Sequence, residues 1–300
     1  MPTLYGHIRR KIDQMLGIRA SSYPYMSGDS FRTLAQHVYG DPDIRLDPAS
    51  VKKGDVVFVK ADKVADFMRD VHPRIGERYV AISHNSDAII DASWLPYFDD
   101  PKVIRWFGQN ATVSHPKLVP LPIGLENLHW HTNGEVSVFH KVSEESKRKN
   151  IFKKFRILYA FTARTNEAER LPALESLAKN EMADDMKKAR GSDGLPGLPE
   201  YANILNGYAL VASPPGNGID CHRTWEAMYL GVLPIVKRSP AMEYFRSIGL
   251  PLWIIDSWDE VPNDVRSLRA RYDAVWSSAS VKALWMDYWI KEIDAARREA

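Results

Sequence analysis

The segment 208–236 constrains the fold of this chain more than any other part of its 300 residues. Its first five residues, 208–212, are an apolar run with the length of a short buried strand. The loop 213–218, which contains two prolines and two glycines, then interrupts this run. A second apolar run at 232–236 predicts another strand, so the segment is typical of a strand, helix and strand unit in an α/β fold.

A short amphipathic helix is predicted between these two strands. Asp220 is placed to serve as its N-cap, and Gly231 is placed to end it. Trp225, Met228 and Tyr229 follow the i, i+3, i+4 spacing of a buried helix face. The glycine-bearing loop therefore leads directly to a helix N-terminus, where unpaired backbone N–H groups and the helix dipole favour an anion.

Two charged residues of this helix suggest a nucleotide diphosphate as the anion. The planar guanidinium of Arg223 can bind a diphosphate, and Glu226 can accept hydrogen bonds from ribose hydroxyls. Gly216, Asn217 and Gly218 would hold the diphosphate from the loop. The alternative is that Arg223 and Glu226 form an ordinary i, i+3 ion pair on the helix.

The pattern of Arg223, Glu226, Ala227, Gly231 and Pro234 resembles the nucleotide-sugar-binding half of exostosin-like glycosyltransferases. Fucosyltransferases and other GT-B enzymes carry related patterns. In the exostosin-like family the motif lies in the C-terminal Rossmann-like domain, where the Arg and Glu are expected to hold the diphosphate and ribose of a nucleotide sugar. Cys221 and His222 depart from the small or hydroxyl residues expected before the arginine.

The length of the chain exceeds what one compact core usually holds, which favours two domains. We expect an α/β fold of GT-B type, in which two Rossmann-like domains face a central cleft. Residues 1–150 would form the acceptor-side domain and residues 151–300 the nucleotide-sugar-binding domain. A polar, charged stretch at 132–155 would connect them. The resemblance also implies that the last helix returns to the first domain.

Composition excludes several other classes of protein. The 40 Lys and Arg residues nearly balance the 38 Asp and Glu residues, which argues against a nucleic-acid-binding protein. The single cysteine rules out an internal disulfide framework and suits a reducing compartment such as the cytoplasm. No apolar run approaches the length of a membrane span, whereas eukaryotic exostosins usually carry an anchor, so we expect a bacterial-type relative without one.

Polar residues follow the predicted strands of the first domain. The strands at 54–60, 79–83, 103–107 and 118–121 are apolar, and the ends of the last three are followed by polar clusters. Because strands in α/β folds release functional loops at their carboxyl ends, these clusters are expected to face a cleft.

An inverting reaction, which the resemblance implies, requires a base that takes the acceptor's hydroxyl proton. Asp87 and His84 are the first candidates, with Asp29 and Glu126 behind them. Asp87 can instead cap its own loop, and His84 can instead be a buried, hydrogen-bonded imidazole.

Residues that would bind the acceptor are Asp29, Arg32 and Glu126. The first two belong to the aromatic and polar stretch 23–32, where tyrosine rings could stack on sugars. Ser27 or Asp29 can also cap a helix that runs through Val38, and capping alone would explain Asp29.

Two basic residues of the second domain are further candidates for donor binding. Arg164 follows the predicted strand 156–161, and Lys237 follows the strand 232–236. A surface ion pair is an equally good interpretation of Arg164, and a solvated loop position would explain Lys237. The Gly- and Pro-rich loop 191–199 could order over the nucleotide base, although such loops are commonly only surface connections.

No metal site is predicted. Asp41 and Asp43 spell an Asp-x-Asp motif but do not follow a buried strand, and His129 and His131 have no third ligand at a clear spacing. We therefore expect no cofactor, with a nucleoside diphosphate sugar as donor substrate, a UDP-sugar favoured, and positive charge replacing the metal. The acceptor would be a hydroxyl of a glycan or of a lipid-linked sugar.

Two alternatives to this enzyme remain. One is a non-catalytic nucleotide-sugar or glycan-binding protein of the same fold. The other is an NAD-type oxidoreductase, which is disfavoured because neither half carries Gly-x-Gly-x-x-Gly after its first strand.

The basic amphipathic helix predicted at 4–19 has two interpretations. It can pack on its own domain, or it can contact the inner surface of an anionic membrane.

Overall fold

The computed structural model describes residues 19–40, 46–130, 133–191 and 196–300. Within these ranges no helix is both long and apolar enough to cross a membrane. The predicted N-terminal helix (apart from Arg19), Asp41, Asp43, His131 and the centre of the loop 191–199 lie outside the described residues.

The first half of the chain forms a parallel five-stranded sheet in the order β1-β2-β3-β4-β5. The strands are β1 (His37–Tyr39), β2 (Val56–Lys60), β3 (Tyr79–His84), β4 (Val103–Gln109) and β5 (Leu118–Leu121). Strands β2, β3 and β4 are buried on both faces, which explains why they appear as continuous apolar runs rather than as alternating patterns. Helices α3 (Val64–Asp70) and α4 (Leu95–Asp99) contact this sheet.

One predicted helix of this half is shorter in the structure. Helix α2 (Gly28–Arg32) ends well before Val38, and residues 37–39 instead pair with β2 as the edge strand. Ser27, one of the two predicted caps, accepts a hydrogen bond from the backbone N–H of Ser30. Pairing with β2 has overridden the local helical pattern here.

The second half forms another parallel five-stranded sheet, in the order β10-β9-β8-β6-β7. The strands are β6 (Lys154–Tyr159), β7 (Ala183–Asp185), β8 (Tyr208–Ala212), β9 (Leu233–Lys237) and β10 (Trp253–Ile255). The chain moves outward from β6 in both directions, to β7 on one side and to β8 on the other. The carboxyl ends of β6 and β8 therefore border the topological switch point, where open α/β sheets bind ligands.

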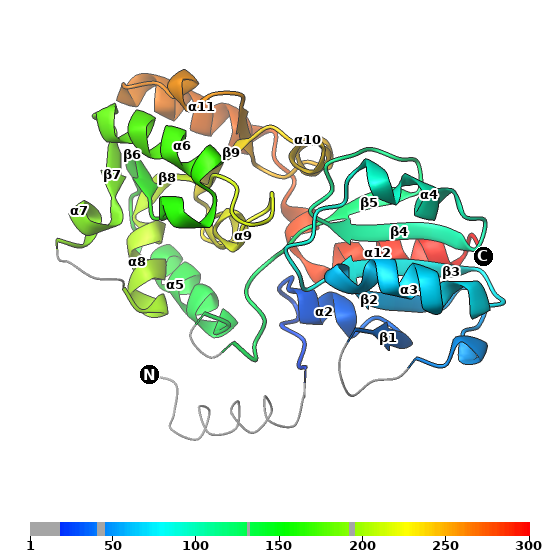
Figure 1. The fold of residues 1–300 in the computed structure, drawn as a ribbon. Coiled ribbons are helices and arrows are strands. Elements are labelled where there is room, and N and C mark those ends of the chain that lie inside the picture. The colour runs from blue at the N-terminus through cyan, green and yellow to red at the C-terminus, as the bar shows by residue number, and fades with distance from the viewer. Residues whose placement is uncertain (1–18, 41–45, 131–132, 192–195) are drawn as a thin grey trace.

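Seven helices of the described residues accompany this sheet (Figure 1). They are α5 (Val136–Lys149), α6 (Glu167–Lys179), α7 (Met186–Arg190), α8 (Leu198–Asn206), α9 (His222–Tyr229), α10 (Pro240–Ser247) and α11 (Val265–Ser277). Helix α5 precedes residue 150 and yet packs against α8 and α9 of the second half. The two sheets lie on either side of residue 150 in the sequence, but α5 packs with the second domain although it precedes that residue.

The last helix, α12 (Met286–Arg297), returns to the first sheet, as predicted, and contacts β3 and β4 (Figure 1). The fold is therefore α/β, with two domains that are each built around a parallel, Rossmann-like sheet, as predicted. The strand, helix and strand unit predicted from residues 208–236 is confirmed as β8, α9 and β9.

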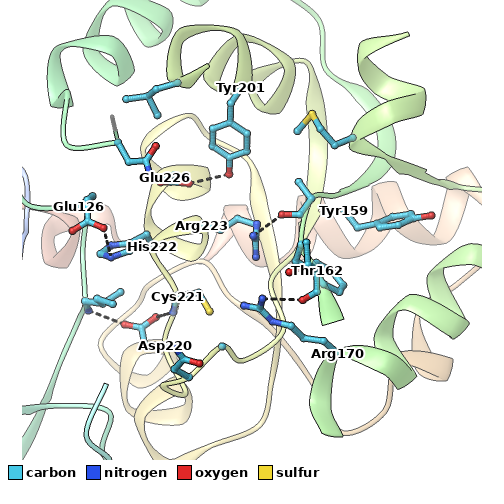
Figure 2. Close-up of a pocket in the computed structure, with 18 of the residues that line it drawn as sticks. Glu126, Tyr159, Thr162, Arg170, Tyr201, Asp220, Cys221, His222, Arg223 and Glu226 are labelled. Atoms are coloured by element: carbon cyan, nitrogen blue, oxygen red, sulfur yellow. Dashed lines mark hydrogen bonds and ion pairs between the residues drawn. The ribbon is translucent and has the colours of Figure 1, made fainter. Parts of the chain in front are cut away.

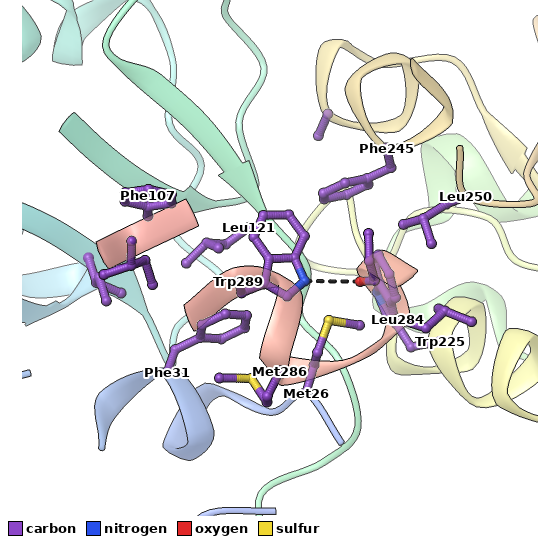
Figure 3. Packing of buried hydrophobic residues seen from close by; sticks show 14 of the residues in the cluster. Met26, Phe31, Phe107, Leu121, Trp225, Phe245, Leu250, Leu284, Met286 and Trp289 are labelled. Atoms are coloured by element: carbon purple, nitrogen blue, oxygen red, sulfur yellow. Dashed lines mark hydrogen bonds between the residues drawn. The ribbon is translucent and has the colours of Figure 1, made fainter. Parts of the chain in front are cut away.

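A large buried cluster contains residues of both domains (Figure 3). Trp289 of α12 packs edge-on against Phe31 of the first domain, with ring centroids 6.1 Å apart, and the same cluster contains Trp225 and Phe245 of the second. The indole N–H of Trp289 donates to the carbonyl oxygen of Ala283 at 2.9 Å, so its polar atom is satisfied despite complete burial. This shared core sets the position of one sheet relative to the other.

Candidate functional site

A cavity of about 640 Å³ lies at the carboxyl ends of β6 and β8, where the two domains meet (Figure 2). Its walls come from the ends of β6 and β7, from the loop after β8, from the start of α9 and from loops of the first domain. This volume is in the range of small-molecule and cofactor sites. The switch point of the second sheet thus coincides with an interdomain cavity.

Helix α9 begins at this cavity, and its N-cap is Cys221 rather than the predicted Asp220. The Cys221 side chain makes no capping bond to the helix. The N-terminus of α9 therefore has no side-chain cap, and the residues that start the helix line the cavity.

Two arginines line the cavity without a carboxylate partner among the described residues (Figure 2). Arg223 donates through Nη2 to the Ala160 carbonyl at 2.6 Å, while its buried Nε and Nη1 have no hydrogen-bond partner there. Arg170, which is 7% exposed, donates to the carbonyl oxygens of Pro215 and Thr162. Both guanidiniums lie over the Phe161 ring, at 5.7 and 5.8 Å from its centroid.

The positive charges of these two arginines are costly because the groups are partly desolvated and close together. Burial lowers the pKa of Arg170, and the neighbouring Arg223 lowers it further. Two neighbouring cations that repel each other, one of which (Arg223) has unpaired N–H groups, are typical of a site that receives an anion.

Glu226 lies one turn after Arg223 on the cavity wall and is 8% exposed. Its Oε2 accepts a hydrogen bond from the Tyr201 hydroxyl at 2.9 Å (Figure 2). Burial raises the pKa of the Glu226 carboxyl. Arg223 and Glu226 form no ion pair with each other, so the alternative of a simple helical pair is wrong.

The glycine loop after β8 brings backbone close to other groups. A Cβ on Gly216 would lie 3.0 Å from Nη2 of Arg170, and one on Gly218 would lie 2.5 Å from the Asn110 amide of the first domain. Any side chain at Gly218 would therefore displace the Asn110 side chain of the first domain. Between them, Asn217 donates through Nδ2 to Oδ2 of Asp87 at 3.1 Å.

Asp87 is exposed and lines the cavity from the first domain. Glu126, another predicted residue, lines the same cavity, with its Oε2 at 3.4 Å from Nε2 of His222 (Figure 2). The structure therefore brings together seven predicted residues, namely Asp87, Glu126, Gly216, Asn217, Gly218, Arg223 and Glu226.

His84 does not fit its predicted role as a base. It is 1% exposed, its Nε2 contacts the Pro122 carbonyl at 3.0 Å, and its Nδ1 accepts the Asn85 backbone N–H at 2.7 Å. Burial lowers its pKa to about 4. With its lone pair already used, His84 is the buried, hydrogen-bonded imidazole that was the alternative interpretation.

Asp29 and Arg32 are also not placed as predicted for acceptor binding. Asp29 is fully buried, where it accepts from Asn85 Nδ2 at 3.0 Å and contacts His129 Nδ1 at 2.9 Å. Arg32 is half-buried and lies outside the walls of the interdomain cavity. A short α2 buries its first turn against the first sheet, so these side chains do not reach the cavity.

The two remaining residues predicted to bind the donor, Arg164 and Lys237, do not line the cavity. Arg164 is exposed, and Lys237 contacts the Asp256 carbonyl beside β10. Arg170, which was not predicted, takes the place expected for Arg164. The sequence signal that would have identified Arg170 is its spacing. It lies three residues before Ala173 and seven before Leu177, on the buried face of α6.

Asp220 lines the cavity and links the two domains. Its carboxylate accepts from the backbone N–H groups of Ile123 and Cys221, both at 2.8 Å, and from the indole N–H of Trp225. Burial raises its pKa from 3.8 to about 6, against the opposing effect of these donors and of nearby His222. The predicted cap is therefore an interdomain anchor.

The stability that Asp220 contributes is expected to fall as pH rises from about 4 to about 6. Over this interval the folded protein keeps the proton that the unfolded chain has lost, so the free energy of unfolding decreases by roughly 3 kcal/mol from this group. Urea denaturation of the wild type and of Asp220→Asn at several pH values would measure it. The difference between the two proteins should carry this slope, and a pH-independent difference would contradict the assignment.

Comparison with known proteins gives only distant likenesses. No protein-family model matches the chain, and no curated protein matches its sequence. Among solved structures, it is similar to the pneumococcal O-GlcNAc transferase GtfA in complex with UDP and GlcNAc, at 12% identity over 82% of this chain with a TM-score of 0.40. This chain spans 57% of the length of that GtfA chain.

Two further structures show a similar degree of likeness. HepE from Anabaena, in complex with UDP-glucose, is 9% identical over 81% of this chain and 77% of its own, with a TM-score of 0.42. A glycosyltransferase from Rickettsia africae is 10% identical over 82% of this chain and 71% of its own, with a TM-score of 0.36. These likenesses are too distant to assign an activity.

Proposed function

We propose that this protein is a glycosyltransferase that moves a sugar from a nucleoside diphosphate sugar to an acceptor hydroxyl, with inversion and without a metal ion. The observation that carries the proposal is the pair of uncompensated guanidiniums, Arg170 and Arg223, at an uncapped helix N-terminus in the interdomain cavity. A diphosphate offers negative charge for both guanidiniums and acceptor oxygens for the unpaired Nε and Nη1 of Arg223. The favoured donor is a UDP-sugar, in keeping with the resemblance to exostosin-like enzymes.

The remaining cavity residues have roles that follow from their positions. Glu226, oriented by the Tyr201 hydroxyl, would accept hydrogen bonds from the ribose. Asp87 faces the donor loop from the opposite domain, so it would take the proton of the acceptor hydroxyl. The acceptor oxygen then forms a bond to the anomeric carbon, and the nucleoside diphosphate leaves with the electron pair of the bond it loses.

Positive charge at the leaving group supplies the main electrostatic stabilisation in this proposal. The nucleoside diphosphate gains negative charge as its bond to the sugar breaks, and the guanidinium of Arg223 is already buried beside that position. Such preorganised charge costs no reorganisation during the reaction. That the reaction needs no metal ion stays a prediction. Measuring turnover in the presence of a chelator tests it.

Binding of nucleotides to the wild-type protein tests the proposal. We expect UDP or GDP to raise the apparent free energy of unfolding by about 2.7 kcal/mol at a ligand concentration 100 times Kd. CMP and NAD should give much smaller shifts, because CMP lacks a diphosphate and NAD presents its diphosphate between two nucleosides. Thermal denaturation followed by calorimetric titration would measure this. Stabilisation by NAD alone, or by none of the four, would overturn the proposal.

A further inference from the structure

We propose that a second, smaller cavity beside the donor site binds the acceptor, and that the acceptor group it accommodates is an uncharged sugar. The proposal rests on the function proposed above and narrows its acceptor class. It restricts the predicted glycan or lipid-linked acceptor, because any phosphate or carboxylate of the acceptor would have to lie outside this cavity.

The second cavity has a volume of about 290 Å³ and is continuous in its walls with the donor cavity. The two share Asp87, Ile123, Glu126 and His222. A hydroxyl of a molecule in the smaller cavity would thus approach the donor sugar beside Asp87. Transfer of the sugar from the donor to an acceptor in the smaller cavity has to take place at this position.

Gln109 supplies an unused hydrogen-bond acceptor in the wall of this cavity. It ends β4, is 2% exposed, and its Oε1 has no hydrogen-bond partner among the described residues. A buried amide oxygen without a partner costs free energy, and a ligand that donates a hydrogen bond removes this cost. A sugar hydroxyl is such a donor, whereas a phosphate or carboxylate oxygen at neutral pH is not.

A fixed network of amides forms the adjoining wall. Asn127 Nδ2 donates to Asn85 Oδ1 at 3.1 Å, and Asn85 Nδ2 donates to Asp29 Oδ1 at 3.0 Å. Asn127 Oδ1 in turn accepts the backbone N–H of Asp29 at 2.7 Å. Buried Asp29 therefore acts by positioning Asn85 and Asn127, both of which line the cavity.

Trp130 provides an apolar face at the rim. Its side chain is 54% exposed, although it lines the cavity and packs against the His129 ring at a centroid distance of 5.1 Å. Its backbone is held by hydrogen bonds to Asn127 and from Gly134. An exposed aromatic ring beside polar groups suits the C–H face and the hydroxyls of a sugar ring.

The charge of the cavity selects against anions. Two carboxylates, Asp87 and Glu126, line it together with His84 and His222, and its described walls contain no lysine or arginine. The donor cavity, with its two arginines, has the opposite character. An anionic sugar such as a uronate would meet like charge here, and it would leave Gln109 Oε1 unsatisfied wherever its carboxylate faced that atom.

Matched pairs of glycosides test this inference directly. The probes are p-nitrophenyl β-glucoside, β-galactoside and α-mannoside, each titrated with and without UDP and followed by saturation-transfer NMR. The p-nitrophenyl β-glucuronide differs from the glucoside only by its carboxylate at C6. We expect at least one neutral glycoside to bind with millimolar affinity, and the glucuronide to bind at least about 10-fold more weakly than the glucoside or not at all.

Variants of Gln109 and Trp130 test whether the neutral glycoside binds in the smaller cavity. Gln109→Leu and Trp130→Ala should each weaken the neutral glycoside by about 10-fold, whereas Trp130→Phe should keep most of the affinity. Gln109→Glu keeps an acceptor oxygen and a similar volume, so it should retain more neutral-sugar binding than Gln109→Leu. All four variants should bind UDP within about twofold of the wild type, which controls for loss of the fold.

The outcomes separate this inference from the proposed function. If UDP binds and no neutral glycoside does, or if the glucuronide binds more tightly than the glucoside, the acceptor assignment is overturned and the donor site stands. Unchanged glycoside affinity in both Gln109→Leu and Trp130→Ala also overturns it. If glycosides bind as expected and UDP does not, the proposed glycosyltransferase function fails while the cavity keeps its role as a sugar site.

Discussion

Replacing Arg223 with alanine is expected to weaken UDP binding by between about 100-fold and 10,000-fold. The buried Nε and Nη1 of this residue have no partner among the described residues, and each would form a charge-assisted hydrogen bond to the diphosphate. Bonds of this kind contribute roughly 1.5–3 kcal/mol each, and every 1.4 kcal/mol is a tenfold change in Kd. Calorimetric titration of UDP into the two proteins would measure the loss.

The chain offers matched controls for this experiment. Arg164→Ala removes an exposed arginine of the same domain that lies outside the cavity, so it should change the Kd of UDP by less than about twofold. Arg223→Lys should recover only part of the affinity, because an ammonium provides charge without the planar pair of donors. Equal effects of Arg164→Ala and Arg223→Ala would contradict the placement of the diphosphate.

Replacing Asp87 with asparagine is expected to lower kcat by about 100-fold to 10,000-fold, the usual contribution of a general base. Asparagine has the same shape and keeps an oxygen that can accept the hydrogen bond from Asn217. It cannot take a proton, so the affinity for UDP should change little while turnover is lost. The measurement is the rate of UDP release from the nucleotide sugar in the presence of a glycoside that binds.

Glu126 is the alternative base, because it lines both cavities and carries a carboxylate. Glu126→Gln is therefore the matched comparison, expected to lose less turnover than Asp87→Asn because Nε2 of His222 already contacts its Oε2. The reverse order of effects would transfer the role of base to Glu126. If the wild type binds UDP but shows no transfer activity, the non-catalytic nucleotide-sugar-binding alternative is favoured.

Several features of the site were predictable because they are local in sequence. The strand 208–212, the glycine loop and the start of α9 are consecutive, so the spacing of Gly216, Gly218 and Arg223 already specifies which of them share a helix N-terminus. Apolar runs likewise predicted β2, β3, β4 and β5, because strands buried on both faces need apolar residues throughout. Asp87 and Glu126 were found by the rule that functional loops follow strand ends.

Other features depended on contacts between distant segments. His84 and Asp29 carry suitable chemical groups, but packing of α2 against the first sheet buries both and uses their hydrogen-bonding atoms. Arg170 looked like an ordinary helix residue until α6 placed it beside Phe161 and the loop after β8. The strand at 37–39 formed against its helical pattern because β2 offered an unpaired edge.

The sequence by itself determined most strands of the two sheets and the glycine loop that leads into α9, because these follow from periodicity and from residues adjacent in the chain. Only the tertiary structure decided which polar groups face a cavity and which are already satisfied. The reason is that desolvation and hydrogen-bond pairing depend on neighbours from other segments, as at Asp220, where donors from Ile123 and Trp225 turn a predicted helix cap into a link between domains.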